Sequence, residues 1–90
     1  MEETRLNRVR FRAWRRGFRE ADLILGPFAD LHVRAMSSDE LDRFEALLEQ
    51  ADHDIYGWIL GSLPIPPEFD DALMSRLKAF RPGGAATVGG

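Results

Sequence analysis

The stretch SSDELDRFEALL, residues 37–48, carries the clearest helix signal in the chain. The Ser37 hydroxyl can accept a hydrogen bond from the Glu40 amide while the Glu40 carboxylate reaches back to the Ser37 amide, which is the capping box that starts many helices. Apolar residues then recur at helical spacing, and they predict one buried face formed by Leu41, Phe44, Leu47 and Leu48. A helix with one apolar face needs other elements to cover it, and the sequence on both sides predicts such elements.

Upstream of this stretch, the spacing of apolar residues predicts two further helices. The first covers about residues 4–14 or 4–16, with an apolar side that includes Leu6, Val9 and Ala13. The second is expected to begin near Arg19 or Glu20 and to bury one stripe, made of Ile24, Phe28 and Leu31. Because proline removes an amide donor and clashes with the preceding turn, Gly26-Pro27 predicts a kink or two short helical pieces.

Downstream, two short helices are expected. Asp52 or Asp54 can cap a fourth helix, whose buried residues are expected to be Ile55, Trp58 and Ile59, and Gly61 is expected to end it in the left-handed conformation. Pro67 can serve as the first residue of a last helix, since its missing amide would be unpaired there anyway. The apolar stripe of that helix is expected to contain Phe69, Leu73, Leu77 and Phe80.

No alternation typical of strands, internal repeat or heptad series accompanies these helices. The sequence therefore predicts an all-α fold, a small compact bundle of about five short helices. Residues 1–81 are expected to form a single helical domain. Residues 82–90 are rich in glycine and lack periodicity, so we expect a flexible tail there.

Composition argues against several classes of function. The chain has no cysteine, which excludes disulfides, thiolate nucleophiles and zinc-thiolate sites. His32 and His53 are its only imidazoles, and neither is accompanied by residues at catalytic or metal-ligand spacing, so we expect neither an enzyme nor a metal site. No apolar run is long enough to insert into a membrane, and the acidic start lacks the features of a signal peptide. We therefore expect a cytoplasmic, monomeric protein, and the lack of transit-peptide features favours a bacterial protein over a mitochondrial precursor.

Charge is distributed unevenly along the chain. Residues 1–20 contain seven arginines and three glutamates, whereas residues 21–72 contain twelve acidic residues and two arginines. A basic segment of this kind is compatible with nucleic acid, with an anionic protein partner or with an anionic cofactor, and composition does not choose between them.

The densest group of charges is RRGFRE, residues 15–20, between the first two predicted helices. Glycine inside a helix costs about 1 kcal/mol relative to alanine, so Gly17 indicates a helix junction or a close approach by another molecule. We therefore selected the following residues as the candidate partner-binding site: Arg15, Arg16, Gly17, Phe18 and Glu20.

The order of these features resembles the succinate dehydrogenase assembly factor family. The family signature Arg-Gly-x-x-Glu is matched by Arg16, Gly17 and Glu20. The resemblance extends from about residue 8 to residue 80. Beyond the signature, a proline-led final helix and four segments are spaced as in the family, and the segments are residues 22–25, 27–29, 47–49 and 54–58. Phe18 departs from the pattern, because methionine commonly follows the glycine in the family.

The resemblance implies a helical, non-enzymatic assembly factor that promotes covalent attachment of FAD to the flavoprotein subunit of succinate dehydrogenase, with fumarate reductase as a second candidate client. It implies that FAD belongs to the partner, so we expect no tightly bound cofactor here; which residues of this chain would contact a flavin is unknown. It also implies that Arg16 bonds to partner acceptors and that Glu20 bonds to partner donors or holds Arg16 in place, whereas an internal Arg16–Glu20 helix pair is the competing interpretation.

Two other functions stay open at this stage. A nucleic-acid-binding domain would use the arginine-rich first segment, with Arg5, Arg8, Arg12, Arg15, Arg16 and Arg19. The acidic remainder of the chain would repel phosphates, so we do not expect nucleic acid to be the partner. The other alternative is a small adaptor or antitoxin-like protein that binds a different protein.

Overall fold

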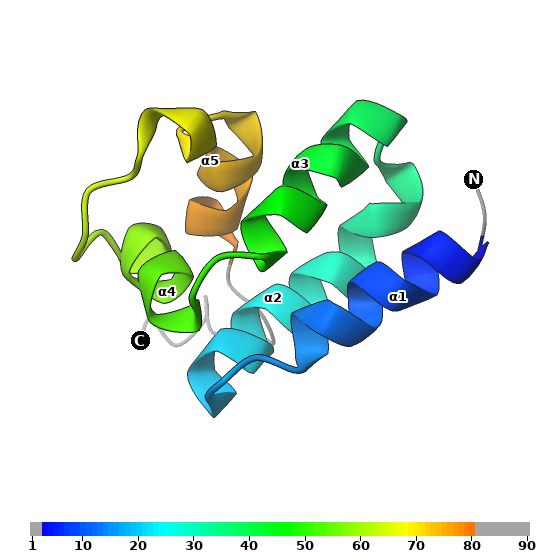
Figure 1. Ribbon diagram of the computed structural model, residues 1–90, viewed down its shortest axis with the longest axis horizontal. Helices are drawn as coiled ribbons and strands as arrows, with labels where there is room; N and C mark the ends of the chain where they lie inside the picture. The colour runs from blue at the N-terminus through cyan, green and yellow to red at the C-terminus, as the bar shows by residue number, and fades with distance from the viewer. Residues whose placement is uncertain (1–2, 81–90) are drawn as a thin grey trace.

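The computed structural model describes residues 3–80, and these residues form five α-helices, two short 3-10 turns and no strand (Figure 1). The helices are α1 (Glu3–Trp14), α2 (Arg19–His32), α3 (Ser38–Leu48), α4 (Asp52–Leu60) and α5 (Ala72–Ala79), and the 3-10 turns are Val33–Ala35 and Pro67–Phe69. The predicted all-α bundle is thus confirmed over the described part of the chain. The expected tail, residues 82–90, lies outside the described residues. None of the helices between residues 3 and 80 is long and apolar enough to cross a membrane.

The helices are arranged around an antiparallel hairpin formed by α1 and α2 (Figure 1). Helix α3 lies along this hairpin, and α5 contacts α2, α3 and α4. The turn between α1 and α2 lies at the same end of the molecule as α4 (Figure 1). This arrangement brings two connections that are far apart in sequence, α1–α2 and α3–α4, to one place.

One core holds the helices together. Phe28 of α2 is fully buried, and its ring makes edge-on contacts with Phe44 (centroids 5.8 Å apart) and Phe80 (5.4 Å). Each of the other helices contributes apolar side chains to the same cluster, including Leu6, Val9 and Ala13 from α1, Ile55 and Trp58 from α4, and Leu73, Met74 and Leu77 from α5. Burial of these faces is the main source of stability, because isolated helices of this length are marginal in water.

The predicted signals at α3 and at the end of α4 are confirmed. The Glu40 amide donates to Ser37 Oγ (3.1 Å) and the Ser37 amide donates to Glu40 Oε1 (2.9 Å), which completes the capping box. All four residues of the predicted α3 face are buried. Gly61 ends α4 with a φ of 86°, a left-handed conformation that glycine adopts without steric cost.

The predicted stripe on α2 is wrong in part. Phe28 is buried, but Leu31 is 68% exposed and Ile24 is only half-buried. The helix instead buries Leu25 and Phe28 together with three small residues, Ala21, Gly26 and Ala29, because α1 approaches it closely on that side. Of the two alternatives expected at Gly26-Pro27, two separate pieces are ruled out, since α2 continues through Pro27 as one helix, and the kink stays a prediction.

Two predicted helix starts are wrong as well. The N-cap residue of α4 is Ala51, which makes no side-chain cap, because the Asp52 carboxylate is bound elsewhere. Pro67 opens a 3-10 turn, and α5 begins only at Ala72, where Asp71 Oδ1 accepts from the Met74 amide (3.0 Å).

The aromatic residues of this region still pack as core. Phe69 lies outside α5, yet its ring stacks on Trp58 with the centroids 5.4 Å apart. The prediction that Trp58 is a core residue is confirmed, since only 7% of it is exposed.

His32, at the end of α2, makes the stability of the fold depend on pH. Its ring lies against Phe28 and Phe80, and Nδ1 is 3.2 Å from Nη2 of Arg76. A guanidinium can only donate, so Nδ1 accepts and the imidazole is neutral. Burial, and then the charge of Arg76, lower the pKa of His32 below its ordinary value of 6.5.

We expect the free energy of unfolding to be nearly constant well above pH 6.5 and to fall as the pH drops through this value. The unfolded chain takes up a proton at His32 in that range, whereas the folded chain resists protonation, so protons favour the unfolded state. Urea denaturation between pH 7.5 and pH 5.5 measures this, and the slope should be smaller in His32→Gln. Equal slopes in both proteins would assign the pH dependence to other groups.

Candidate functional site at the junction of α1 and α2

The predicted junction is confirmed, because α1 ends at Trp14 and α2 begins at Arg19. The last turn of α1 closes with a hydrogen bond from the Arg15 amide to the Arg12 carbonyl (3.2 Å). Phe18 is the N-cap residue of α2 and is extended, with φ −152° and ψ 160°. Residues 15–18 therefore form a tight turn that reverses the chain.

Arg16 fixes this turn to the connection between α3 and α4. Its side chain is only 8% exposed, and Nε donates to Asp52 Oδ1 at 2.7 Å. Its Nη2 donates to the carbonyls of Leu48 (2.9 Å) and Gln50 (3.2 Å), at the end of α3. The carbonyls that end a helix have no partners within it, so a buried guanidinium both satisfies them and places a positive charge at the negative end of the helix dipole.

Further bonds complete the attachment of Arg16. Nη1 donates to the Arg12 carbonyl (3.3 Å), and the Arg16 amide donates to Asp22 Oδ1 (2.7 Å) in the first turn of α2. Four of the five N–H donors of this guanidinium thus have partners within the chain. We call this network, centred on Arg16 and Asp52, the Arg16 clamp.

Gly17 lies directly against the clamp. Its amide donates to Asp52 Oδ2, so one carboxylate receives both the Arg16 side chain and the Gly17 backbone. A Cβ atom at Gly17 would overlap that same oxygen. A side chain at residue 17 would therefore push the Asp52 carboxylate away from the Gly17 amide. Of the two explanations that the sequence suggested, the helix junction is confirmed, and the close approach seen here is made by a carboxylate of the same chain.

Phe18 packs against α4. Its ring stacks on His53 (centroids 4.7 Å apart, planes 15° apart) and meets Tyr56 edge-on at 5.1 Å. Phe18 and Tyr56 are half-buried, whereas His53 is exposed. The aromatic group gives the turn a second attachment to α4, in addition to the Arg16 clamp.

Arg15 and Glu20 are the two candidate residues whose side chains face solvent, and the Gly17 backbone is exposed beside them. Arg15 makes no ion pair, and its guanidinium carbon lies 4.5 Å from the centre of the Phe11 ring. Glu20 lies in the first turn of α2, where a negative charge is favoured by the helix dipole. The structure therefore brings the five candidate residues together in one turn but separates them into a fixed part and an exposed part.

Comparison with known proteins decides the family. A family model described as "flavinator of succinate dehydrogenase" matches residues 7–81. The chain belongs to the succinate dehydrogenase flavinator family. It is 35% identical over 77 residues to "succinate dehydrogenase assembly factor 2, mitochondrial" of Candida glabrata, covering 81% of this chain and 50% of that protein. It is 34% identical over 73 residues to "FAD assembly factor SdhE" of Acetobacter pasteurianus, covering 81% of this chain and 67% of that protein.

A third relative, "succinate dehydrogenase assembly factor 2, mitochondrial" of Dictyostelium discoideum, is 36% identical over 63 residues, which cover 70% of this chain and 45% of that protein. The chain thus spans about half the length of the mitochondrial relatives that it matches and two thirds of the bacterial one. The match includes the whole candidate site, and the family resemblance inferred from the sequence is confirmed.

The flavinator signature residues do different things in this structure. Arg16 and Gly17 are held by Asp52, whereas Glu20 is exposed and has no bond to Arg16. The competing interpretation of an internal Arg16–Glu20 helix pair is wrong, because α1 ends before Arg16 and the guanidinium points to Asp52. For the same reason, Glu20 does not hold Arg16 in place.

Sequence reasoning missed the role of Asp52. It lies 36 residues after Arg16, and it was interpreted as a possible helix cap. No local pattern marks such a pair, since helix and cap signals extend over only three or four residues.

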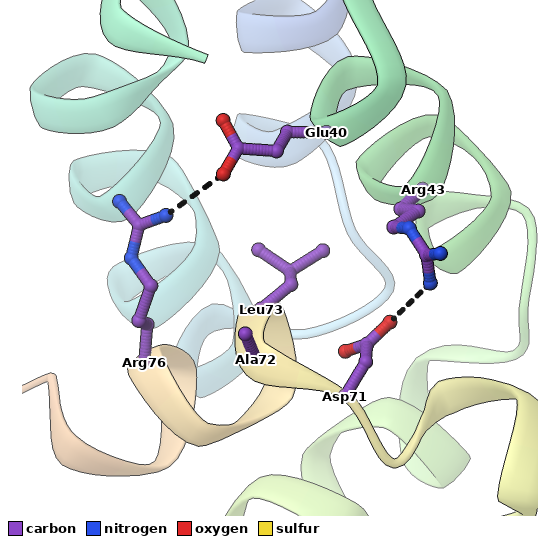
Figure 2. A pocket seen from close by; sticks show the side chains of 6 residues that line it. All are labelled: Glu40, Arg43, Asp71, Ala72, Leu73 and Arg76. Atoms are coloured by element: carbon purple, nitrogen blue, oxygen red, sulfur yellow. Dashed lines mark hydrogen bonds and ion pairs between the residues drawn. The ribbon is translucent and has the colours of Figure 1, made fainter. Parts of the chain in front are cut away.

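A second surface feature of this flavinator-family chain lies away from the junction. A hollow between α3 and α5 has Leu73 and Ala72 at its floor, and ion pairs between Arg76 and Glu40 (3.8 Å) and between Arg43 and Asp71 (3.3 Å) flank it (Figure 2). These charges are already paired, so the hollow presents little that would attract a charged ligand.

Proposed function

We propose that this chain is a non-enzymatic assembly factor that binds the flavoprotein subunit of succinate dehydrogenase and promotes the covalent attachment of FAD to it, with fumarate reductase as a second candidate client. Family membership supports the activity. One structural observation supports the binding site: a turn fixed from inside by the Arg16 clamp, which exposes Glu20 beside the Gly17 backbone. A rigid turn loses little conformational entropy on binding, which favours recognition.

In this proposal the bond-forming chemistry belongs to the partner and its FAD, and this chain holds no cofactor tightly. It contributes by binding one conformation of the partner more strongly than the others. Such preferential binding increases the population of the conformation that reacts, without any reacting group on the assembly factor. Its cytoplasmic location and monomeric state stay predictions.

The five candidate residues would have different roles in binding the partner. Glu20 and Arg15, which are exposed, would make charge-assisted hydrogen bonds with partner groups. Gly17 would allow the partner backbone close to the turn. Arg16, with four donors already used, would act mainly as a positioning residue, and Phe18 would hold the turn on α4.

The test measures covalently bound flavin on the succinate dehydrogenase flavoprotein in a strain that lacks this gene. We expect most covalent flavin to be lost and to return with the wild-type gene. Glu20→Ala should fail to restore it while its circular dichroism and unfolding curve stay normal, because this exposed carboxylate makes no bond to any other residue between 3 and 80. Arg16→Ala should fail and also be less stable.

Glu68→Ala is the matched control, since Glu68 is an exposed glutamate on another part of the surface. It should restore flavinylation fully. Normal flavinylation in the deletion strain would overturn the proposed function. Full restoration by Glu20→Ala would instead remove Glu20 from the binding site.

A further inference from the structure

Three arginines of the described chain have no acidic partner. Seven others form ion pairs with carboxylates, namely Arg5, Arg10, Arg12, Arg16, Arg34, Arg43 and Arg76. Within residues 3–80 the exceptions are Arg8, Arg15 and Arg19, and all three are exposed. In a chain with an excess of acidic residues, unpaired arginines are not explained by a shortage of carboxylates.

Two of these arginines share one side of α1 with an exposed aromatic residue. Arg8, Phe11 and Arg15 are three and four residues apart, so they lie along one face of the helix. The buried residues of α1 point the other way. Phe11 is 58% exposed, and the Arg15 guanidinium covers part of its ring. The surface formed by Arg8, Phe11, Trp14 and Arg15 is called the α1 outer face below.

The α1 outer face includes a shallow hollow beside Phe11. Trp14 and Asp30 line it together with Asn7, Arg10, Phe11 and Arg15. Trp14 is held in place, because its Nε1 donates to Asp30 Oδ2 (3.2 Å) while Arg10 Nε donates to Asp30 Oδ1 (3.0 Å). The Trp14 ring also lies on Gly26 of α2. One wall of the hollow is thus an aromatic ring whose orientation is fixed before any partner arrives.

We propose that the α1 outer face is a docking surface for an acidic part of the flavoprotein subunit, which would pair carboxylates with Arg8 and Arg15 and accept Phe11 in an apolar pocket. Aromatic residues and arginine are the types that dominate binding energy at protein interfaces. Guanidinium groups without internal partners match carboxylates in charge and geometry. This inference rests on the proposed function, and it extends the binding site from the junction along α1, since Arg15 belongs to both.

A nucleic acid fits this surface less well. Binding to a phosphate backbone depends on the number of phosphates that cationic side chains neutralise, and the α1 outer face has only two unpaired arginines, out of three within residues 3–80. The many carboxylates of residues 21–72 would repel the same backbone. An acidic protein surface of limited size avoids this repulsion.

The experiment measures binding of the full chain to the purified, non-flavinylated flavoprotein subunit by titration calorimetry at several salt concentrations. We expect Phe11→Ser to weaken binding by about tenfold or more, as for a central aromatic contact. We expect Arg8→Glu combined with Arg15→Glu to weaken it at low salt and to reduce the salt dependence. Arg34→Glu is the matched control and should leave binding unchanged, because Arg34 is an exposed arginine that pairs with Glu3 at the other end of α1.

The outcomes separate the two proposals. If the wild-type chain does not bind the subunit at all, the proposed function is overturned. If it binds and Glu20→Ala weakens binding while Phe11→Ser and the double arginine variant do not, the α1 outer face is overturned together with the binding role of Arg15, and the proposed function itself stands. Tight binding of a 20-base-pair DNA duplex that is lost in the double arginine variant would overturn it in favour of nucleic acid. Circular dichroism of each variant should match wild type, because these side chains make no buried contacts.

Discussion

Replacing Asp52 by alanine is expected to lower the free energy of unfolding by about 3 kcal/mol, the range found when one partner of a buried ion pair is removed. The variant leaves the Arg16 charge buried without a carboxylate and leaves the Gly17 amide without its acceptor. Arg16→Ala should cost a similar amount, because it removes the donors to the Leu48 and Gln50 carbonyls as well. Urea denaturation followed by circular dichroism measures both.

The double variant tests whether Arg16 and Asp52 stabilise the fold through their contact with each other. If Arg16 and Asp52 act on each other, Arg16→Ala with Asp52→Ala should be more stable than the sum of the single effects implies, by about 2 kcal/mol. Arg15→Ala is the neighbouring control and should change stability by less than about 0.5 kcal/mol, since that side chain is exposed. Strictly additive single effects would show that the Arg16 clamp does not couple the two residues.

The second large effect concerns Gly26, in the middle of α2. Alanine in a helix interior is favoured over glycine by about 1 kcal/mol, so the substitution should stabilise an isolated helix. In this fold a Cβ atom at Gly26 would overlap the ring of Trp14 at three carbons. The ring would have to leave α2 and give up its bond to Asp30. We therefore expect Gly26→Ala to destabilise the protein by about 1 to 2 kcal/mol.

The sign of this effect should reverse once the ring is absent. In a Trp14→Ala background, Gly26→Ala should stabilise by about 1 kcal/mol, because only the helix preference remains. Urea denaturation of the four proteins measures the reversal, and tryptophan fluorescence should report a more exposed Trp14 in Gly26→Ala alone. A stabilising effect in both backgrounds would mean that the ring moves aside without cost.

Local patterns predicted the helices well where the interactions that form them are local. The Ser37–Glu40 box, the α3 face and the Gly61 stop each depend on residues no more than a few positions apart, and all were confirmed. Leu31 and Pro67 were misinterpreted because their surroundings depend on packing. The side of α2 that is buried depends on where α1 approaches, and the start of α5 depends on the 3-10 turn before it.

At the candidate site, too, local features were predicted from the sequence, whereas features that depend on packing were not. Sequence alone located the junction and its charged residues, and a resemblance in residue order led to the family that the comparisons confirmed. The sequence did not predict that the Arg16 side chain is buried in the Arg16 clamp while the Arg15 side chain is exposed. The two are neighbours with identical side chains, so only their surroundings differ.

The sequence by itself therefore determined the all-α class, most helix bounds and the location of the junction, because hydrogen bonds and apolar contacts within a few residues control these features. Tertiary structure alone decided which arginines are paired and which remain available. Asp52 reaches Arg16 across 36 residues only when α4 packs beside the α1–α2 turn, whereas Arg8 and Arg15 have no carboxylate partner among residues 3–80.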